Sequence, residues 1–329
     1  MPLWTPAEIT TALVLDSADT STITVDGTAV TAISDKSGNS RNFIQSTASY
    51  RPIVGATIND IGAIQFDGTN DFLYAPLAAD FLANTAKSIF VVFQGRGVGT
   101  YDFAVSSRIN FGGVDNSEKG FLSVADTRTI YVHTGKGDSI VTSALSRETA
   151  YQIGFTVGAN AASPAHYRDG SALTLTTNTL IAAAAENSAG YMVLGQQAGA
   201  FAGGNFGELI WINGVVDTTT RQLIEGYLAW KWGLEANLPA DHPYKSAAPT
   251  INKVSGVVTV NGSPAARTVA VFRRSDFTLL GTTTSNATTG AFEILNDLIP
   301  ADANALLVTA IDSTGTYNAV SVDYITSVA

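Results

Sequence analysis

Residues 225–244, EGYLAWKWGLEANLPADHPY, decide the fold, because they hold an amphipathic helix in a chain whose other segments have the pattern of strands. We expect the helix to begin after Asp217, where Thr219 and Gln222 have the spacing of a capping box. Gly233 is suited to end it, since glycine readily adopts the left-handed conformation of a helix C-cap. A β-rich chain with one such helix at the end of a long domain belongs to a small set of architectures.

One side of this helix is apolar. Leu223, Tyr227 and Trp230 recur at i, i+4 and i+7, which places them on the same face. We therefore predict that Trp230 lies in the core. Trp232 points to a different side, so we predict that it covers a domain edge or a subunit contact.

The segments before the helix predict an all-β sandwich. KSIFVVFQG (87–95) is a continuous β-branched and aromatic run, as in a strand covered on both faces. Residues 23–33 alternate about Asp26 and Gly27, a pair that favours a hairpin turn. Turn residues separate further short strand candidates, which are 121–125, 129–134, 151–157, 166–173, 191–195 and 206–214.

A second, smaller domain follows the helix. Residues 243–253 contain prolines and small residues without periodicity, so they predict a linker. We predict a first domain over residues 1–249 and a small immunoglobulin-like or transthyretin-like β-sandwich over residues 250–329. The strand patterns of the second domain are 254–265, 268–285, 290–295 and 305–312.

The composition excludes several classes of protein. Hydrophobic residues make up 45% of the chain and charged residues 14%, a mixture that supports a buried core. The net charge of −10 and the absence of a basic patch argue against nucleic-acid binding. The chain has no cysteine, which excludes disulfides and thiolate metal sites. Its apolar runs are too short to span a bilayer, so we expect no membrane partner.

Three segments of the first domain resemble the concanavalin A-like lectin and glucanase superfamily, in its laminin G-like branch. They are SDKSGNSRN (34–42), AIQFDGTNDFLYAP (63–76) and the stretch from GELIWING to LPADHPY (207–244). The resemblance implies a jelly-roll β-sandwich that is closed by the C-terminal helix of the domain.

The second domain is similar to carboxypeptidase-regulatory-like modules over residues 254–294. Its ending, GTYNAVSVDYITSV (315–328), resembles the C-termini of virion-associated proteins of phages. The pairing implies a structural or adhesive protein of a tailed bacteriophage, such as a capsid decoration, tail or fibre component. Such a protein is assembled into the virion in the bacterial cytoplasm. Its partners would be other virion proteins and further copies of itself in a symmetric homo-oligomer.

Catalytic groups of the superfamily are missing. Its glucanases carry the strand motif E-x-D-x-x-E, which places carboxylates on one face of a sheet. Here Glu208 is followed by apolar residues, with no second acid at 210 or 212. The three histidines, His133, His166 and His242, are isolated from one another. We therefore expect no catalytic residue and no enzyme.

Calcium is the cofactor for which the sequence offers ligands. Asp67, Asn70 and Asp71 lie in one turn and supply hard oxygen atoms. Their spacing is not that of an EF-hand loop, and tight turns also select Asp and Asn for backbone reasons. Of the two interpretations, a turn without a metal is preferred to a calcium site.

Aromatic side chains can stack on sugar rings, and the candidates are Tyr101, Tyr131, Tyr167 and Trp211. Trp211 alternates with Leu209 on a strand, so we predict that it is buried. Two functions stay open: docking and display on a virion, and carbohydrate-binding adhesion to glycans of the host surface. A glycan-degrading enzyme is disfavoured, because the paired acids are missing.

Overall fold

The structure is a computed structural model of the whole chain. It divides into a large unit, Ile9–Ala247, and a small unit, Ala248–Ala329 together with Met1–Glu8. The division lies inside the segment 243–253, where the sequence predicts a linker. The structure describes residues 4–76, 85–108, 119–125, 129–133, 138–142, 145–159, 163–178, 190–197, 199–250, 252–295, 299, 305–312 and 320–325.

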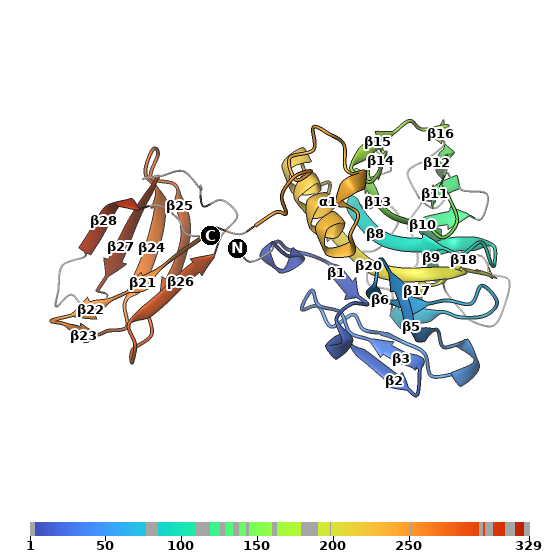
Figure 1. Ribbon diagram of the computed structural model, residues 1–329, viewed down its shortest axis with the longest axis horizontal. Coiled ribbons are helices and arrows are strands. Elements are labelled where there is room, and N and C mark those ends of the chain that lie inside the picture. Colours follow the sequence, from blue (N-terminus) through green and yellow to red (C-terminus); the bar gives the residue numbers. More distant parts are fainter. Residues whose placement is uncertain are drawn as a thin grey trace. The chain divides into compact units, whose positions relative to one another are not determined.

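The first layer of the large unit is an antiparallel sheet built around long strands (Figure 1). At its centre, β8 (Lys87–Gly95) pairs with β20 (Gly204–Asn213) on one side and β13 (Ala150–Val157) on the other. Residues 87–95 therefore form a central, almost entirely buried strand, as their apolar run predicts. The outer strands are β1 (Leu13–Asp16) beside β20, and β14 (Ala165–Arg168) and β15 (Ser171–Leu173) beyond β13.

A second antiparallel layer faces the first. It includes β2 (Ile23–Asp26) and β3 (Ala29–Ile33), which form the hairpin predicted at residues 23–33. The hairpin of β5 (Ile53–Ile58) and β6 (Ile61–Gln65) joins the layers, because β5 pairs with β3 and β6 with β20. In order of pairing, the second layer is β16 (Thr177–Asn178), β12 (Asp138–Thr142), β11 (Thr129–His133), β10 (Lys119–Ala125), β9 (Tyr101–Arg108), β17 (Tyr191–Leu194), β7 (Leu73–Pro76), β4 (Phe43–Ile44), β3 (Ala29–Ile33) and β2 (Ile23–Asp26).

The main hydrophobic core lies between these layers. On β20, Leu209 and Trp211 point into the core, and Trp211 is fully buried there, as predicted. Phe103 of β9 and Leu73 of β7 approach from the opposite layer. Because alternate side chains of each strand fill the same core, the prediction of an all-β sandwich is confirmed.

Short elements complete the large unit. A small hairpin is formed by β18 (Gln196–Gln197) and β19 (Ala200–Phe201). The 3-10 turns are η2 (Thr20–Thr22), η3 (Ala48–Tyr50) and η6 (Glu235–Asn237). Among the described residues, no helix is both long enough and apolar enough to cross a membrane.

Helix α1 (Thr218–Trp232) covers the outer face of the first layer, against β8 and β13 (Figure 1). It begins after Asp217, as predicted, but the capping box of Thr219 and Gln222 is wrong. Asp217 itself is the N-cap, and its carboxylate accepts the backbone N–H of Thr220 at 2.7 Å. Gly233 ends the helix in the left-handed region, with φ of 66°.

The predictions for the two tryptophans of the helix are wrong, since Trp232 and not Trp230 lies in the core. Trp232 is fully buried, whereas Trp230 is only partly buried and donates its indole N–H to the carbonyl of Tyr244 at 2.8 Å. The reason is the rotation of the helix. Ile224, Leu228 and Trp232, at i, i+4 and i+8, are fully buried, so this row faces the sheet.

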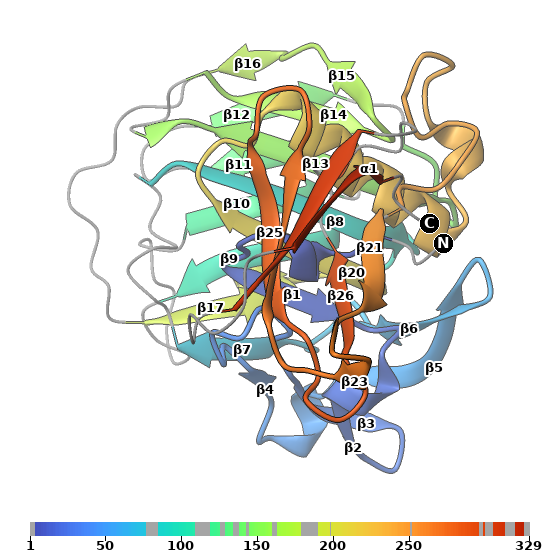
Figure 2. The ribbon, with the colours of Figure 1, turned by 90° about the vertical axis from the view of Figure 1, so that its left-hand side faces the viewer.

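The small unit is a β-sandwich with two unequal sheets (Figure 2). Four strands form one sheet in the order β25 (Leu279–Thr284), β24 (Thr268–Arg273), β27 (Leu306–Ile311) and β28 (Val320–Ile325). The other sheet contains β21 (Lys253–Val257) and β26 (Ala291–Leu295), and a hairpin of β22 (Thr259–Val260) and β23 (Ser263–Pro264) follows β21. Its core contains Val269, Val271 and Leu306. The unit also includes the 3-10 turn η1 (Pro6–Glu8).

Candidate functional site

Glu208 is the acid at which we looked for the carboxylate motif of the glucanases. A bulge in β20 turns its side chain away from the main core. Phe206 pairs with Phe93 and Glu208 pairs with Val92, so Gly207 is an extra residue between them. Without the bulge, Glu208 would share a face with Phe206. With it, Glu208 points to the side of the sheet that α1 covers.

Glu208 is the centre of a buried polar group that we call the Glu208 cluster: Asp16, Glu208, Tyr227, Lys231 and Trp232. The ammonium of Lys231 lies 2.7 Å from Oε2 of Glu208 and 2.8 Å from Oδ2 of Asp16. The hydroxyl of Tyr227 donates to Oε1 of Glu208 at 3.0 Å, and the indole N–H of Trp232 donates to Oε2 at 2.9 Å. The cluster therefore joins the helix to both β1 and β20.

This geometry suits a structural role and not acid–base catalysis. Glu208 is completely buried, and both of its carboxylate oxygens already accept hydrogen bonds from α1. Burial raises the pKa of Glu208, and the charge of Lys231 opposes the shift. A glycosidase acid must reach a glycosidic oxygen, and a carboxylate sealed under a helix has no such access.

A second buried ion group fastens the segment after the helix. Glu225 accepts bonds from the guanidinium of Arg221 at 2.7 and 2.8 Å, and Nε2 of His242 lies 3.3 Å from the same carboxylate. The backbone N–H of Tyr244 donates to Nδ1 of His242, so Nε2 carries the proton that faces Glu225. His242 thus holds the chain at 242–244 against the helix.

His166 packs inside the large unit. His166 is buried, and its ring lies 5.0 Å from that of Phe155 in an edge-to-face contact. Burial lowers the pKa of His166 to about 4, so the imidazole is neutral at physiological pH. The side chain of His133 lies outside the described residues.

The turn at residues 34–42 also serves the fold. One oxygen of Asp35 accepts the backbone N–H of Val14 at 3.0 Å, and the other accepts that of Arg41 at 3.1 Å. The side chains of Asn39 and Arg41 donate to the carbonyl of Ala12 at 3.2 and 2.7 Å. These polar residues of the turn therefore bind the edge of β1, whose strand partner in the described part of the chain is β20 on its other side.

The proposed calcium ligands are engaged with the backbone of their own turn. Oδ1 of Asp67 accepts the N–H groups of Thr69, Asn70 and Asp71 at 2.7, 3.1 and 3.3 Å. Oδ2 of Asp71 accepts the N–H of Asp67 at 2.9 Å. Burial, and then the charge of Asp67, raise the pKa of Asp71 to about 7.

This arrangement is that of a closed Asx-type turn. In the described part of the chain, no three acidic or histidine side chains come together as metal ligands. The turn also packs tightly: a Cβ on Gly68 would lie 2.7 Å from the carbonyl oxygen of Val98.

The aromatic residues that the sequence suggests as sugar contacts lie in different places where the structure describes their side chains. Trp211 is buried in the main core, and Tyr167 lies beneath the guanidinium of Arg221, 4.2 Å from it. Tyr101 begins β9 and is partly buried, and the side chain of Tyr131 lies outside the described residues.

A different set of aromatic rings does lie together, and we call it the aromatic row. Tyr50 and Phe72 have ring centroids 5.6 Å apart, Phe72 and Tyr74 6.2 Å, and Tyr74 and Tyr191 5.3 Å. Phe201 lies 6.5 Å from Phe72. Tyr50 is 40% exposed, and Tyr74, Tyr191 and Phe201 are partly exposed. Sequence reasoning missed the row, because its members come from segments that are far apart in the chain.

No family profile matches the sequence, and no curated protein sequence matches it. Solved structures match at the level of the fold. Sialidase of Trypanosoma rangeli in complex with sialic acid has a TM-score of 0.47 at 13% identity, over 70% of this chain and 34% of the sialidase. The binding domain of Paraclostridial Mosquitocidal Protein 1 has a TM-score of 0.45 at 11% identity, over 97% of this chain and 73% of that domain.

An arabinofuranosidase in complex with arabinofuranosyl-alpha-1,2-xylobiose has a TM-score of 0.43 at 13% identity, over 85% of this chain and 64% of the enzyme. The chain spans about a third of the length of the sialidases that it matches. The fold assignment rests on the strands described above, since likeness at this level bears on neither activity nor ligand.

Proposed function

We propose that the chain is a non-enzymatic structural accessory protein of a tailed bacteriophage virion, acting by docking and surface display. One observation carries the docking role: the polar side chains of the large unit that were candidates for chemistry hold the fold together. Among the described residues, Glu208 and Asp16 are buried beneath α1 and paired with Lys231 of the helix, and Glu225, a buried residue of α1 itself, is paired with Arg221.

The virion setting is supported by the resemblance of the two domains and of residues 315–328 to phage proteins. A two-unit β-rich chain without cysteines depends on packing for its stability, which suits a particle component. Repeated copies on a symmetric particle would give many weak contacts the strength of a stable attachment.

Quantitative mass spectrometry of purified particles tests this proposal. We expect to detect peptides from both units, in amounts that correspond to several copies of the chain per particle. The ratio of the chain to the major capsid protein should stay constant through two successive density gradients. Loss of the chain from the particles during purification, or its absence from them, would contradict the proposal.

Carbohydrate-binding adhesion is the second candidate, and the aromatic row favours it. Partly exposed aromatic rings in a row can stack on the apolar faces of sugars. Within the aromatic row, Tyr50 has the most exposed side chain. On a glycan array, the full chain should bind a defined set of host glycans. Tyr50→Ala should abolish that binding, and Val25→Ala, which changes another exposed side chain of the large unit, should not. An array without specific binding would remove this candidate.

A further inference from the structure

The sandwich of the small unit is incomplete on one side. Its four-stranded sheet ends with β27 and β28, whereas the facing sheet contains only β21 and β26 in the described residues. β26 lies beside β25, at the other end of the long sheet. The free edge of the short sheet is therefore that of β21, and it faces the side on which β27 and β28 lie.

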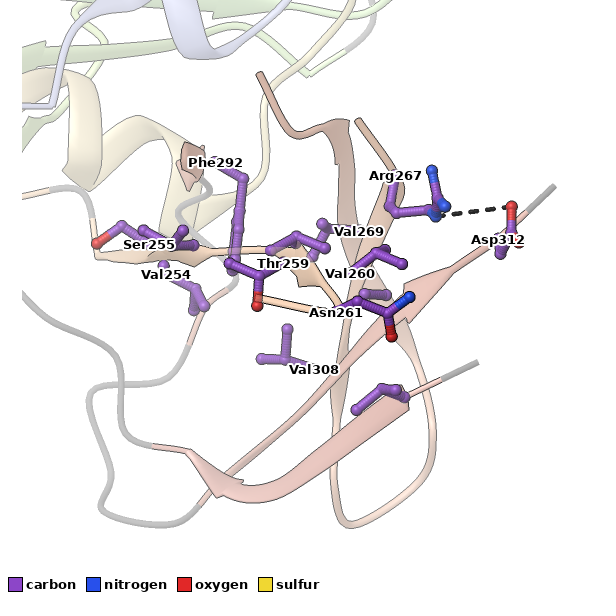
Figure 3. Close-up of a pocket in the computed structure, with 15 residues that line it drawn as sticks. Val254, Ser255, Thr259, Val260, Asn261, Arg267, Val269, Phe292, Val308 and Asp312 are labelled. Atoms are coloured by element: carbon purple, nitrogen blue, oxygen red, sulfur yellow. Dashed lines mark ion pairs between the residues drawn. The ribbon is translucent and has the colours of Figure 1, made fainter. Parts of the chain in front are cut away.

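A groove lies along this edge, and we call it the β21 groove (Figure 3). Its volume is about 600 Å³. The consecutive residues 254–261 line one side of it, and alternate residues of the long sheet, including Val308 and Ala310, line the other. At its rim, Val257 and Val320 are each 64% exposed. This side of the groove consists of most of β21, the short strand β22 that follows it and the first residue of the next turn, so the groove has the shape of an extended chain.

Backbone groups of β21 point toward the open edge. The N–H of Val258 donates to the carbonyl of Gly290 at 2.9 Å, next to the pairing of Val257 with Ala291. Bonds of an antiparallel ladder alternate along each strand. The N–H groups of Ser255 and Val257 therefore point away from β26, as they do on an edge strand that is ready to pair.

We propose that the β21 groove binds an extended segment of another protein chain, which adds a strand beside β21. This inference rests on the docking role proposed above and names the part of the chain that docks. The added strand would pair with Ser255 and Val257 and would bury alternate side chains against Val308, Ala310 and Val320.

The lining indicates the chemistry of the occupant. Valines, an alanine and Phe292 provide most of the walls, so alternate residues of the occupant should be apolar. The charged residues of the lining are Arg267 and Asp312, which already form an ion pair of 3.6 Å, so the groove matches an uncharged segment (Figure 3). A stretch of about six residues would fill it, which is the usual length of a strand.

Binding of a designed peptide to the full chain tests the proposal. The probe is an acetylated and amidated decapeptide, KTVTVTVTVK, in which neutral apolar and polar residues alternate between terminal lysines that confer solubility. Its control has the same sequence with N-methylated valines, which cannot donate backbone hydrogen bonds. Affinity is measured by calorimetry, and the site of binding by amide hydrogen exchange of the full chain.

We expect the probe to bind and to slow exchange at Ser255 and Val257, and the methylated control not to bind. Ser255→Pro removes one groove donor on an edge strand and should weaken binding about threefold to tenfold, the effect of one net hydrogen bond. Ala310→Arg fills the inner face and should abolish binding. Val215→Arg, at an exposed position of the large unit, should leave binding unchanged.

Three results would overturn the proposal: no binding at about 1 mM probe, the weak limit of specific recognition, equal binding of the methylated control, or protection of the same amides by dimerisation of the chain alone. Ser255→Pro and Ala310→Arg are compared at equal folded fraction by circular dichroism. If the peptide fails to bind but particles contain the chain, the groove proposal falls and the virion proposal stands. If the peptide binds and particles lack the chain, the virion proposal falls alone.

Discussion

Replacing Lys231 by methionine should strongly destabilise the large unit. The side chain of Lys231 is mostly buried, and its ammonium lies between the carboxylates of Asp16 and Glu208 at 2.8 and 2.7 Å. Methionine leaves a fully buried Glu208 without its cation, and removing one partner of a buried ion pair typically costs about 3–5 kcal/mol. Asp16 keeps a second cation, Lys36, at 2.9 Å, so we expect the lower end, about 3 kcal/mol.

The assay is urea unfolding followed by tryptophan fluorescence, which reports mainly on the large unit, because Trp211, Trp230 and Trp232 lie in it. The double variant Lys231→Met/Glu208→Gln removes the stranded charge and should recover at least about 1 kcal/mol. Lys245→Met is the matched control. That ammonium bonds only backbone carbonyls in the described residues, so its loss should cost less than about 1 kcal/mol. A loss below about 1 kcal/mol for Lys231→Met, or no recovery in the double variant, would refute the reasoning.

Three further changes test other parts of the structure by the same unfolding assay. Asp71→Asn should flatten the pH dependence of stability: the folded pKa of about 7 lies above the ordinary 3.8, so wild type loses stability as pH rises from 4 to 7. Because the side chain is partly exposed, we discount the full effect and expect the Asp71→Asn variant to be more stable than wild type by about 1–2 kcal/mol at pH 8. Parallel pH profiles of the two proteins would contradict this. Gly207→Ala should cost about 1–3 kcal/mol, because its Cβ would lie 3.1 Å from Trp232 and Val92, and an unchanged midpoint would disprove the close packing. Gly233→Ala should cost about 1 kcal/mol for its left-handed conformation, with stability equal to wild type as the opposing result.

Local sequence rules predicted the elements that depend on local patterns. The buried strand at 87–95, the hairpin at 23–33 and the helix end at Gly233 all follow from side-chain periodicity or turn chemistry. β9 (Tyr101–Arg108) was missed because it carries Asp102 and Ser106 at buried positions, which breaks the apolar pattern of a strand.

The arrangement of polar groups could not be predicted in the same way. The orientation of Glu208 depends on the bulge at Gly207, and a bulge is set by pairing between strands that are distant in sequence. Which of Trp230 and Trp232 lies in the core likewise depends on how the helix rotates against the sheet. Sequence patterns identified the residues of the Glu208 cluster only as unrelated members of strands and a helix.

The central claim is that this chain is a particle component whose β units act by docking, and not by catalysis. A map of the purified particle by electron cryomicroscopy tests it most directly. We predict density at the particle surface, repeated by the particle symmetry, into which the large β-sandwich with its covering helix fits. A map whose surface density is fully accounted for by other proteins would contradict the claim.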